Sequence, residues 1–331
     1  MFSPKRPSPT WKVWLALVLL YGLLAGNLTS LHAFAVNFGP KEGMRAERHA
    51  LIVSMEGGDK PWAYRVGVPM AVEHPLRDIA KAVGAEDPDA REYPYLVIRF
   101  LATFLVLLQT HLLIEVFASR RMAMVGALWV AALHGPSFEH YWFQPASEPD
   151  HALWLTAALL TIRRRDRWLF PLLLLASLIR ETSIFIVALH VALRWKEEHP
   201  QRTVLRALAL AVVWAGPFLW LREVVVLGPP EDNHNVAYYL KKNLFNFEWI
   251  WYAFSFVGPW IILPLLGIRH VPPQLRRMMA VLVPYIVLVF AFGRIREVRL
   301  WLPLTVAWVP AAVVVLNQWV KDEANSRISA R

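Results

Sequence analysis

The chain has 331 residues, of which 56% are hydrophobic, and it contains 16 tryptophans and no cysteine. This composition is typical of a polytopic membrane protein and excludes an ordinary soluble domain. The lack of cysteine also excludes disulfides, thiol catalysis and cysteine metal sites. The formal net charge of +10 does not point to nucleic acid, because the basic residues lie in short clusters between apolar runs, where they set membrane orientation. We therefore expect membrane lipid, and no nucleic acid, as a partner.

The apolar runs predict one all-α membrane domain, covering residues 1–331, with about ten transmembrane segments. Both termini are expected in the cytoplasm, because the short basic clusters then fall on the cytoplasmic side. The first apolar run is expected to remain as a helix, since no small-residue cleavage site follows it. The expected spans are 13–34, 95–118, 122–133, 151–162, two short segments within 168–193, 204–221, 249–268, 279–292 and 300–320.

The longest polar stretch, residues 37–92, is expected to be an external loop after the first span. Its apolar residues recur at helical spacing among charges over 41–55, which predicts an amphipathic helix lying on the membrane surface. Residues 62–69 and 76–83 predict a second, partly buried segment that ends at Gly84. At the other terminus, residues 322–331 are expected to form a disordered cytoplasmic tail.

The apolar run over 168–193 is interrupted near its middle by Arg180 and Glu181. Both flanks of this run are basic, and placing both in the cytoplasm requires two short segments with the polar break near the external face. One long tilted helix is the alternative. Ionisable groups at membrane depth are costly and are usually paired or functional. Arg180 is therefore a candidate for substrate binding, with an internal pair to Glu181 that seals the break as the alternative.

A second charged cluster, between two late apolar runs, breaks the orientation rule that the other loops obey. Arg294, Arg296 and Arg299, together with Glu297, fall on the external side, where positive charge is not expected. Guanidinium groups bind phosphate oxygens bidentately, and a low-dielectric rim strengthens the attraction. We interpret the three arginines as candidates for phosphate binding. The alternatives are unspecific anchoring to lipid headgroups, or an ordinary cytoplasmic turn in a different topology.

Three carboxylates of the long loop, Glu47, Asp59 and Glu73, are candidates for a general base. Partial burial at a membrane interface brings the pKa of a carboxylate closer to neutrality, which suits such a group to take a proton from an acceptor hydroxyl. Each also has a basic neighbour, and a structural ion pair with that neighbour is the alternative role. These neighbours are Arg45 or Arg48 for Glu47, Lys60 for Asp59, and Arg77 for Glu73.

The turn over 134–151 combines aromatic rings with five polar residues, Glu139, His140, Glu148, Asp150 and His151. Flat rings stack on sugar faces, so these five residues are candidates for lining a sugar or headgroup pocket. An aromatic interfacial belt, with a helix cap at residues 147–150, is the alternative.

Two groups of residues have the chemistry to bind a divalent cation, but neither has a specific spacing. Asp87-Pro-Asp89 offers two carboxylates, although this tripeptide is also an ordinary turn. His140, Glu148 and His151 lack a recognised metal-ligand spacing. We therefore assign no metal ligands, and a divalent cation stays an open alternative as a cofactor.

Three short stretches together resemble a known family. They are Trp62-Ala-Tyr-Arg-Val-Gly-Val-Pro69, Ser177-Leu-Ile-Arg-Glu-Thr182 and Arg296-Glu-Val-Arg-Leu-Trp-Leu-Pro303. With the expected topology, they resemble the C-type glycosyltransferase superfamily of integral membrane enzymes, especially its uncharacterised bacterial members. In that superfamily a first helix leads to a long external loop with an acidic residue. Many short spans follow, and a late external arginine contacts a lipid-linked phosphate.

The resemblance implies a transferase that moves a sugar from a polyprenyl-phosphate donor to an acceptor on the external face of a bacterial cytoplasmic membrane. It implies phosphate contacts from Arg296 or Arg299, and a carboxylate of the first loop as base. Tyr64, Arg65 and Arg180 lie in the matching stretches and are further candidates for substrate binding. One departure is that residues 35–40, directly after the first helix, contain no carboxylate, whereas members of known activity often carry an acidic motif there.

Two other functions would use the same residues. A transporter or flippase for an anionic lipid or solute needs ionisable groups along a continuous path through the spans. The ionisable residues within the expected spans are few: Arg99, His111, Glu115, Arg180, Glu181 and His190. A non-catalytic membrane partner would tolerate Glu47→Gln or Asp59→Asn, whereas a transferase that uses these groups would not. The sugar, the acceptor and the oligomeric state stay open.

Overall fold

The structure is a computed structural model that describes residues 10–37, 44–58, 62–87, 89–138, 145–227 and 236–329, which are almost entirely helical. Short 3₁₀ turns are labelled η, and η2 is a π-helical turn. In chain order the elements are α1 (Trp11–Asn37), α2 (Met44–Ser54), β1 (Glu56–Gly58), η1 (Trp62–Tyr64), α3 (Gly67–Ala71), η2 (Val72–Leu76), α4 (Arg77–Ala82), α5 (Asp89–Phe117), α6 (Arg120–His134), η3 (Pro136–Phe138), α7 (Ser147–Ile162), η4 (Asp166–Trp168), α8 (Leu169–Ile179), η5 (Glu181–Ile184), α9 (Phe185–Arg194), α10 (Pro200–Val224), β2 (Val226–Leu227), α11 (Val236–Phe245), α12 (Phe247–Leu266), η6 (Ile268–His270), α13 (Pro273–Val281), α14 (Val283–Phe292), η7 (Val298–Leu304) and α15 (Thr305–Ser329).

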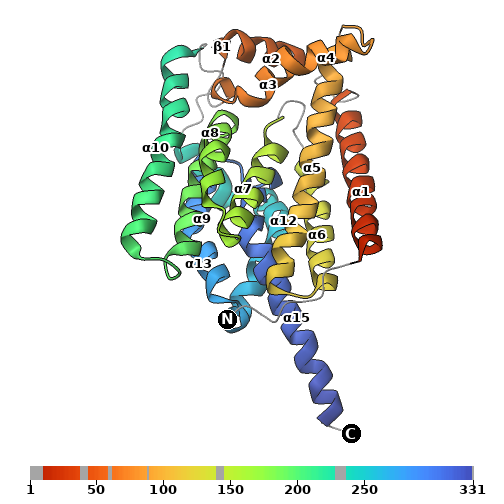
Figure 1. Cartoon of the computed structure of the whole chain (residues 1–331), viewed down its shortest axis with the longest axis vertical. Coiled ribbons are helices and arrows are strands. Elements are labelled where there is room, and N and C mark those ends of the chain that lie inside the picture. The colour runs from red at the N-terminus through yellow and green to blue at the C-terminus, as the bar shows by residue number, and fades with distance from the viewer. Residues whose placement is uncertain are drawn as a thin grey trace.

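The helices form a bundle with two distinct ends (Figure 1). Helix α1 begins and α15 ends at the lower end of the view, which we call the terminal end. The elements of the long polar loop, α2 to α4, cover the upper end, which we call the first-loop end. Helix α5 descends from the first-loop end, whereas α10 rises to it from the terminal end. The start of α1 and the end of α15 therefore share one end of the bundle, as the expected topology requires.

Within the described residues, six helical stretches are long and apolar enough to cross a membrane, judged by length and composition. They are Trp11–Ala35, Asp89–Phe117, Pro200–Val224, Phe247–Leu266, Pro273–Phe292 and Val298–Arg327. Helices α6, α7, α8 and α9 have 15, 16, 11 and 10 residues, fewer than the roughly 20 that a full crossing requires. These are the features of an all-α membrane protein with several passes, and the total of about ten crossings stays a prediction.

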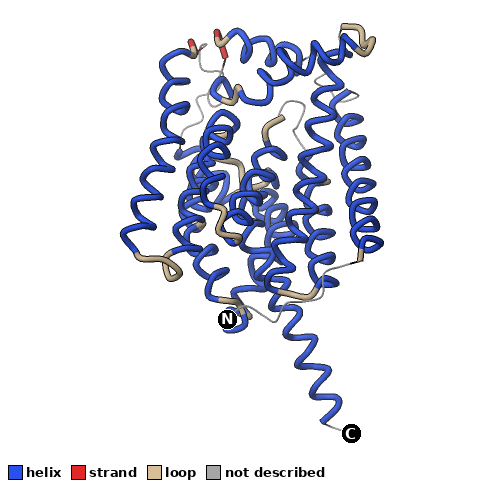
Figure 2. The backbone as a smooth tube through the Cα atoms, in the orientation of Figure 1, coloured by secondary structure: helices blue, strands red, loops and turns tan. Residues whose placement is uncertain are grey.

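The long polar loop folds as a small helical layer at the first-loop end. Helix α2 lies within the predicted amphipathic segment, and α4 is followed by Gly84, whose φ of 96° is a conformation that glycine adopts readily. Strand β1 pairs in parallel with β2, so that Glu56 lies opposite Val226 (Figure 2). Because β2 directly follows α10, this pairing ties the loop to the end of that helix.

Helices α8 and α9 form a hairpin. Helix α8 ends at Ile179, Arg180 is extended (φ −159°, ψ 135°), and a 3₁₀ turn leads into α9. At the base of the hairpin, Asp166 accepts hydrogen bonds from Nη2 of Arg194 at 2.8 Å and from Nη1 of Arg206 in α10 at 2.6 Å. Both basic flanks therefore lie at one end. The prediction of two short segments is confirmed, and one long helix over this region is wrong.

The first half of α15 and the turn before it form the centre of the bundle. Every residue from Trp301 to Val315 is buried, and α15 packs against α5, α6, α12 and α13. Helix α6 approaches so closely that a Cβ atom on Gly126 would clash with the side chain of Ile114 and lie 3.1 Å from Val313. The last helix of the described chain is thus the core around which earlier helices pack.

Residues 322–329 continue α15 as a helix and do not form the expected disordered tail. Exposed pairs at a spacing of four residues support this extension: Gln318 donates to Asp322 at 2.8 Å, and Arg327 pairs with Glu323. This part of α15 projects beyond the rest of the bundle (Figure 1).

Candidate functional site

The start of α7 places three ionisable side chains inside the protein. Glu148, Asp150 and His151 are each at most 2% exposed. Glu148 and Asp150 lie in the first turn of the helix and His151 directly follows it. The N-cap residue is Ala146, which makes no side-chain capping hydrogen bond, so a helix cap over 147–150 is wrong. Ionisable groups buried in a membrane protein are costly and usually mark a functional site. The start of α7 is therefore the candidate site.

The three side chains point to two different faces of α7. Successive residues of a helix are rotated by roughly 100°, so Asp150 faces away from Glu148, whereas His151 shares a face with Glu148. We call these the Asp150 face and the Glu148 face.

On the Asp150 face, the carboxylate has two partners. Its Oδ1 accepts from Nε1 of Trp154 at 3.1 Å, and its Oδ2 lies 3.5 Å from Nη1 of Arg180. Tyr285 of α14 closes this face: its ring lies edge-on to Trp154, with centroids 5.7 Å apart. The Tyr285 hydroxyl donates to the backbone carbonyl of Leu300 at 2.8 Å. Asp150 is thus held by one hydrogen bond of ordinary length and one long contact with a guanidinium group.

A second ion pair extends this row of charges to the surface. Arg65 donates from Nη2 and Nε to the two carboxylate oxygens of Glu181, at 2.5 and 3.2 Å. The side chain of Glu181 is 29% exposed and that of Arg65 is 10% exposed, whereas Arg180 is 4% and Asp150 is 0% exposed. Arg180 and Glu181 each pair with a residue of another element. Their contacts therefore extend beyond an internal pair that seals the break between α8 and α9.

On the Glu148 face, the carboxylate meets α5 and α6. Arg99 donates from Nη2 to Oε1 of Glu148 at 2.7 Å, and Nδ1 of His134 lies 3.8 Å from the same oxygen. The His134 ring stacks on His151, with centroids 5.9 Å apart. Nε2 of His151 lies 2.7 Å from Oγ1 of Thr305, whose hydroxyl donates to a backbone carbonyl of η7. A hydroxyl has one proton to donate, so Nε2 of His151 must carry the hydrogen of this contact.

The three stretches that carry the family resemblance meet at this site. Arg65 belongs to the first stretch, and Arg180 and Glu181 belong to the second. The third contributes Leu300, whose carbonyl is bound by Tyr285 on the Asp150 face. Segments far apart in the sequence are therefore brought together around the start of α7.

The arginine cluster that the sequence singles out lies in the segment leading into η7. Arg299 is buried and binds Glu297 through Nε at 2.9 Å. Arg296 stacks on Trp249, with its guanidinium carbon 5.0 Å from the ring centre. Arg294 is half-buried. Arg299 thus has an acidic neighbour, whereas Arg296 lies on an aromatic face.

Glu73 is the centre of a separate polar cluster at the first-loop end. It accepts from Nε2 of His49 at 2.8 Å and from Arg77, and Nε of Arg91 lies 3.6 Å away. Nδ1 of His49 lies 2.7 Å from the hydroxyl of Tyr95 in α5. Burial on its own raises the pKa of Glu73, but the hydrogen bond from His49 and the charges of the two arginines outweigh it and lower this pKa. The ion pair with Arg77 is confirmed, and a carboxylate with a lowered pKa is a weak proton acceptor.

The remaining candidates of the first loop and the 134–151 turn are placed as follows. Glu47 is exposed on α2, and within the described residues none of its hydrogen bonds or ion pairs connects it to the start of α7. Tyr64 stacks under Arg222 of α10, with the guanidinium carbon 4.7 Å from the ring centre. Asp59, Glu139 and His140 lie outside the described residues.

The described part of the chain contains no group of three His, Cys, Asp or Glu side chains placed to bind a metal ion. Asp87, from the candidate Asp-Pro-Asp triplet, instead pairs with Arg77 at 3.2 Å and with Lys81 at 3.1 Å. The carboxylate of Asp87 is thus engaged by two cationic side chains of α4.

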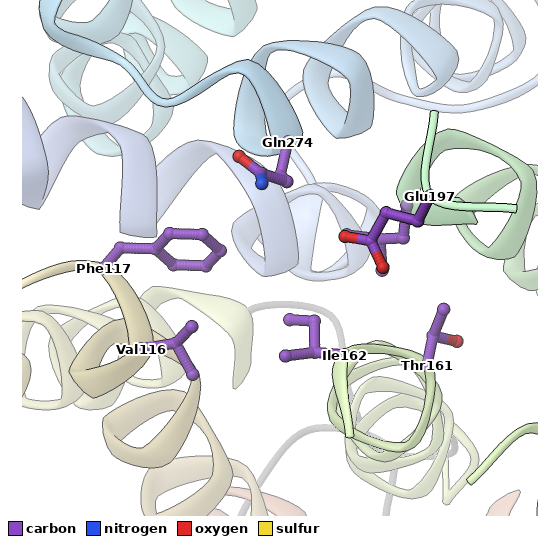
Figure 3. Close-up of a pocket in the computed structure, with 7 residues that line it drawn as sticks. Val116, Phe117, Thr161, Ile162, Glu197 and Gln274 are labelled. Atoms are coloured by element: carbon purple, nitrogen blue, oxygen red, sulfur yellow. The ribbon is translucent and has the colours of Figure 1, made fainter. Parts of the chain in front are cut away.

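A small hollow lies at the end of α7, opposite to the candidate site at its start (Figure 3). It encloses about 310 Å³, part of it open to solvent, between the ends of α5 and α7 and the start of α13. Phe117, Ile162, Glu197 and Gln274 are among its lining residues. Thr161 at this hollow follows His151 of the candidate site by ten residues of α7, a rise of roughly 15 Å at 1.5 Å per residue. It is therefore not part of the candidate site.

Arg99 and His134 are site residues that sequence reasoning missed, and the sequence indicated Asp150 only as a pocket-lining residue and not as a base. Each is an ionisable residue inside or beside an apolar run, which is the signal that could have identified them. The sequence does not show which acid faces which arginine, because that depends on how α7 packs against α5 and α8.

Compared with known proteins, the chain matches no protein family, no curated protein and no solved structure.

Proposed function

We propose that this protein is a membrane glycosyltransferase that moves a sugar from a polyprenyl-phosphate donor to an acceptor hydroxyl, with the reaction centred on Asp150. The supporting observation is that two stretches that resemble the glycosyltransferase superfamily come together at the start of α7: Arg180 lies 3.5 Å from Asp150, and its neighbour Glu181 pairs with Arg65. Such a transfer needs a base for the acceptor proton and cations for the leaving phosphate. Asp150 is the base in this proposal, and Arg180, with Arg65 behind it in the row of charges, supplies the cations.

In the proposed reaction, Asp150 takes the proton of the acceptor hydroxyl as the hydroxyl oxygen attacks the anomeric carbon. The bond between that carbon and the phosphate oxygen breaks, and polyprenyl phosphate leaves with the electron pair. Arg180 stabilises the negative charge that develops on the phosphate. A single displacement of this kind inverts the anomeric carbon.

Asp150 suits the role of base better than the loop carboxylates do. The negative charge of Glu73 is compensated by His49 and two arginines, and Glu47 is exposed. Asp150 has an oxygen, Oδ2, whose contact with Arg180 is long at 3.5 Å. A phosphate that binds Arg180 would leave this oxygen free to accept a proton.

The neighbouring groups have supporting roles in this proposal. The Arg99–Glu148 pair and the His151–Thr305 contact fix the first turn of α7, on which Asp150 is carried. Arg296, stacked on Trp249, is a candidate for a second contact with the donor.

The test is transfer of label from a radiolabelled polyprenyl-phosphate sugar by the protein in nanodiscs, supplied with a membrane extract as the source of acceptors. Asp150→Asn keeps the side-chain volume but cannot take a proton, so transfer should fall by about 100-fold or more. Asp166→Asn is the matched control, because Asp166 also binds arginines but lies at the base of the α8–α9 hairpin. Both variants are expected to lose thermal stability, and only Asp150→Asn is expected to lose transfer.

The same preparation separates the rival functions. A transporter or flippase would move the labelled lipid across a liposome bilayer without breaking the sugar–phosphate bond, and a non-catalytic partner would do neither. Transfer at the wild-type rate by Asp150→Asn would show that Asp150 is not the base. Lipid movement without donor cleavage by the wild type would replace the transferase with a transporter.

A further inference from the structure

We infer that the Arg65–Glu181 ion pair is a self-occupied anion site, in which Glu181 holds the position that the phosphate of a polyprenyl phosphate takes on Arg65. Binding of the lipid phosphate would displace Glu181 and join Arg65 to Arg180. The inference depends on the proposed function for its ligand class, but it concerns binding and not sugar transfer.

The Arg65–Glu181 pair has the bidentate geometry with which arginine also binds phosphate. Arg65 offers two N–H groups, on Nη2 and Nε, to the two oxygens of one carboxylate. Phosphate presents two oxygens at a similar spacing, so the same guanidinium fork fits it without rearrangement. A bidentate carboxylate on an arginine at the edge of a candidate phosphate site is therefore a natural competitor of the ligand.

Glu181 is the partner that can leave. It lies in the 3₁₀ turn at the tip of the α8–α9 hairpin, and its side chain is 29% exposed. Arg65 is fixed more firmly, because its neighbours Ala63 and Val66 are buried and a Cβ atom on Gly67 would lie 3.2 Å from the backbone of Leu178 in α8. A rotation of the Glu181 side chain into solvent would therefore open the site without moving the backbone that carries Arg65.

The charges that remain after this rotation favour an anion. Arg65 and Arg180 both act electrostatically on the position of Glu181. With Glu181 in place, two arginines and two carboxylates make the row neutral. Without Glu181, the two arginines and the carboxylate of Asp150 give the row a formal charge of +1. The phosphodiester of a polyprenyl-phosphate sugar carries one negative charge, so between the two arginines it would restore the balance, and it would draw Arg180 away from Oδ2 of Asp150. The exchange would thus prepare the proposed base in the same step that binds the donor.

The ligand reaches this site from the first-loop end of an apolar bundle, which favours a lipid-borne phosphate. A suitable probe is farnesyl phosphate, a C15 polyprenyl monophosphate, bound to the protein in phosphatidylcholine nanodiscs. Glu181→Gln removes the competing charge and should bind the probe more tightly than the wild type does. If the wild-type site is open about 10% of the time, the gain is about tenfold.

Three further variants make the result specific. Glu181→Asp keeps the charge but is one methylene shorter and cannot keep both contacts with Arg65, so its affinity should lie between those of the wild type and Glu181→Gln. Arg65→Gln should lose binding, with or without Glu181→Gln. Glu198→Gln removes a carboxylate from Arg206 at the base of the hairpin, where the contact is 3.1 Å, and should bind as the wild type does.

Several outcomes would overturn the inference. One is equal or weaker binding by both Glu181→Gln and Glu181→Asp in protein that elutes as a folded species. Equally tight binding of farnesol would show that the phosphate is not recognised. Equal competition by phosphatidylglycerol would assign the site to bulk lipid headgroups, and equal competition by inorganic phosphate would remove the role of the polyprenyl chain. The probe carries no sugar, so its binding is measured independently of transfer. Tighter binding of the probe by Glu181→Gln, together with no transfer from the radiolabelled sugar donor by the wild type, would support this inference and refute the proposed reaction.

Discussion

Asn243 of α11 holds Ile295 through a hydrogen bond from the Ile295 N–H to the side-chain oxygen of Asn243, at 3.1 Å. The amide nitrogen of Asn243 donates to the carbonyls of Phe290 and Gly293, both at 2.8 Å. Asn243 is 1% exposed, so this one buried side chain satisfies three backbone groups in the segment that leads to Arg296.

We expect Asn243→Ala to lower the free energy of unfolding by about 3 kcal/mol, because buried backbone groups that lose their partners cost roughly 1–3 kcal/mol each. Thermal unfolding in detergent, followed by tryptophan fluorescence, measures the change. Gln318→Ala is the control, since the Gln318 amide makes an exposed hydrogen bond to Asp322. Equal unfolding temperatures for the two variants would contradict the role assigned to Asn243.

The cluster at the first-loop end predicts that acid weakens the attachment of α2 to α5. Burial lowers the pKa of His49 from its ordinary 6.5, more than the hydrogen bond with Glu73 raises it, and the charges of Arg91 and Arg77 lower it further. The hydroxyl of Tyr95 faces the other ring nitrogen. A group with a lowered pKa in the folded state stabilises the fold above its unfolded pKa, and this contribution is lost as the pH falls through the folded pKa. The loss from His49 therefore sets in below pH 6.5, and that from Glu73 only below pH 4.5.

We accordingly expect the unfolding temperature to fall when the pH is lowered from about 7.5 to about 5. His49→Gln should reduce this fall, because glutamine can donate a hydrogen bond to Glu73 but does not titrate. His74 is exposed and lies in η2 beside Glu73, so His74→Gln should leave the decrease in unfolding temperature unchanged. An identical pH profile for wild type and His49→Gln would show that another group controls the transition.

Gly126 tests the close approach of α6 to the core. Gly126→Ala places a methyl group against Ile114 and Val313, and overpacking of this kind costs about 1–3 kcal/mol. Gly216→Ala, in α10, meets no atom within 4 Å, and should be neutral or stabilising because alanine is the better helix former. The prediction fails if Gly126→Ala raises the unfolding temperature as Gly216→Ala does.

The Arg99–Glu148 pair is expected to show strong coupling. Glu148→Leu alone leaves the charge of Arg99 buried without its carboxylate, which should cost about 3–5 kcal/mol. The double variant Arg99→Leu/Glu148→Leu removes both charges and should be more stable than Glu148→Leu alone. Chemical denaturation of the wild type, both single variants and the double variant gives the coupling energy. Additive effects would mean that the two groups do not depend on each other.

Some of this architecture could be predicted from local sequence, and some could not. The break between α8 and α9 was predictable because Arg180 and Glu181 interrupt an apolar run, and the end of the loop segment was predictable from Gly84. The partner of Arg180 was not, because Asp150 lies 30 residues earlier in the chain and meets it through the packing of α7 on α8. For the same reason nothing near Asn243 in the sequence indicates its role. The helical extension over 322–329 was not predicted, because its polar composition is also typical of a disordered tail. A small number of exposed side-chain pairs stabilise the helix there.

The central position of α15 has a consequence for biosynthesis. The ribosome makes this helix after all the other described elements, yet residues 301–315 are the part that those elements enclose. Helices α5 and α6 are therefore complete before the helix that they pack around has been translated. Until then, the face of α6 that carries Gly126 must rest against lipid or an insertion chaperone. A nascent chain that stops before Thr305 would remain a loose group of helices, open to the proteases that survey the membrane for orphaned segments.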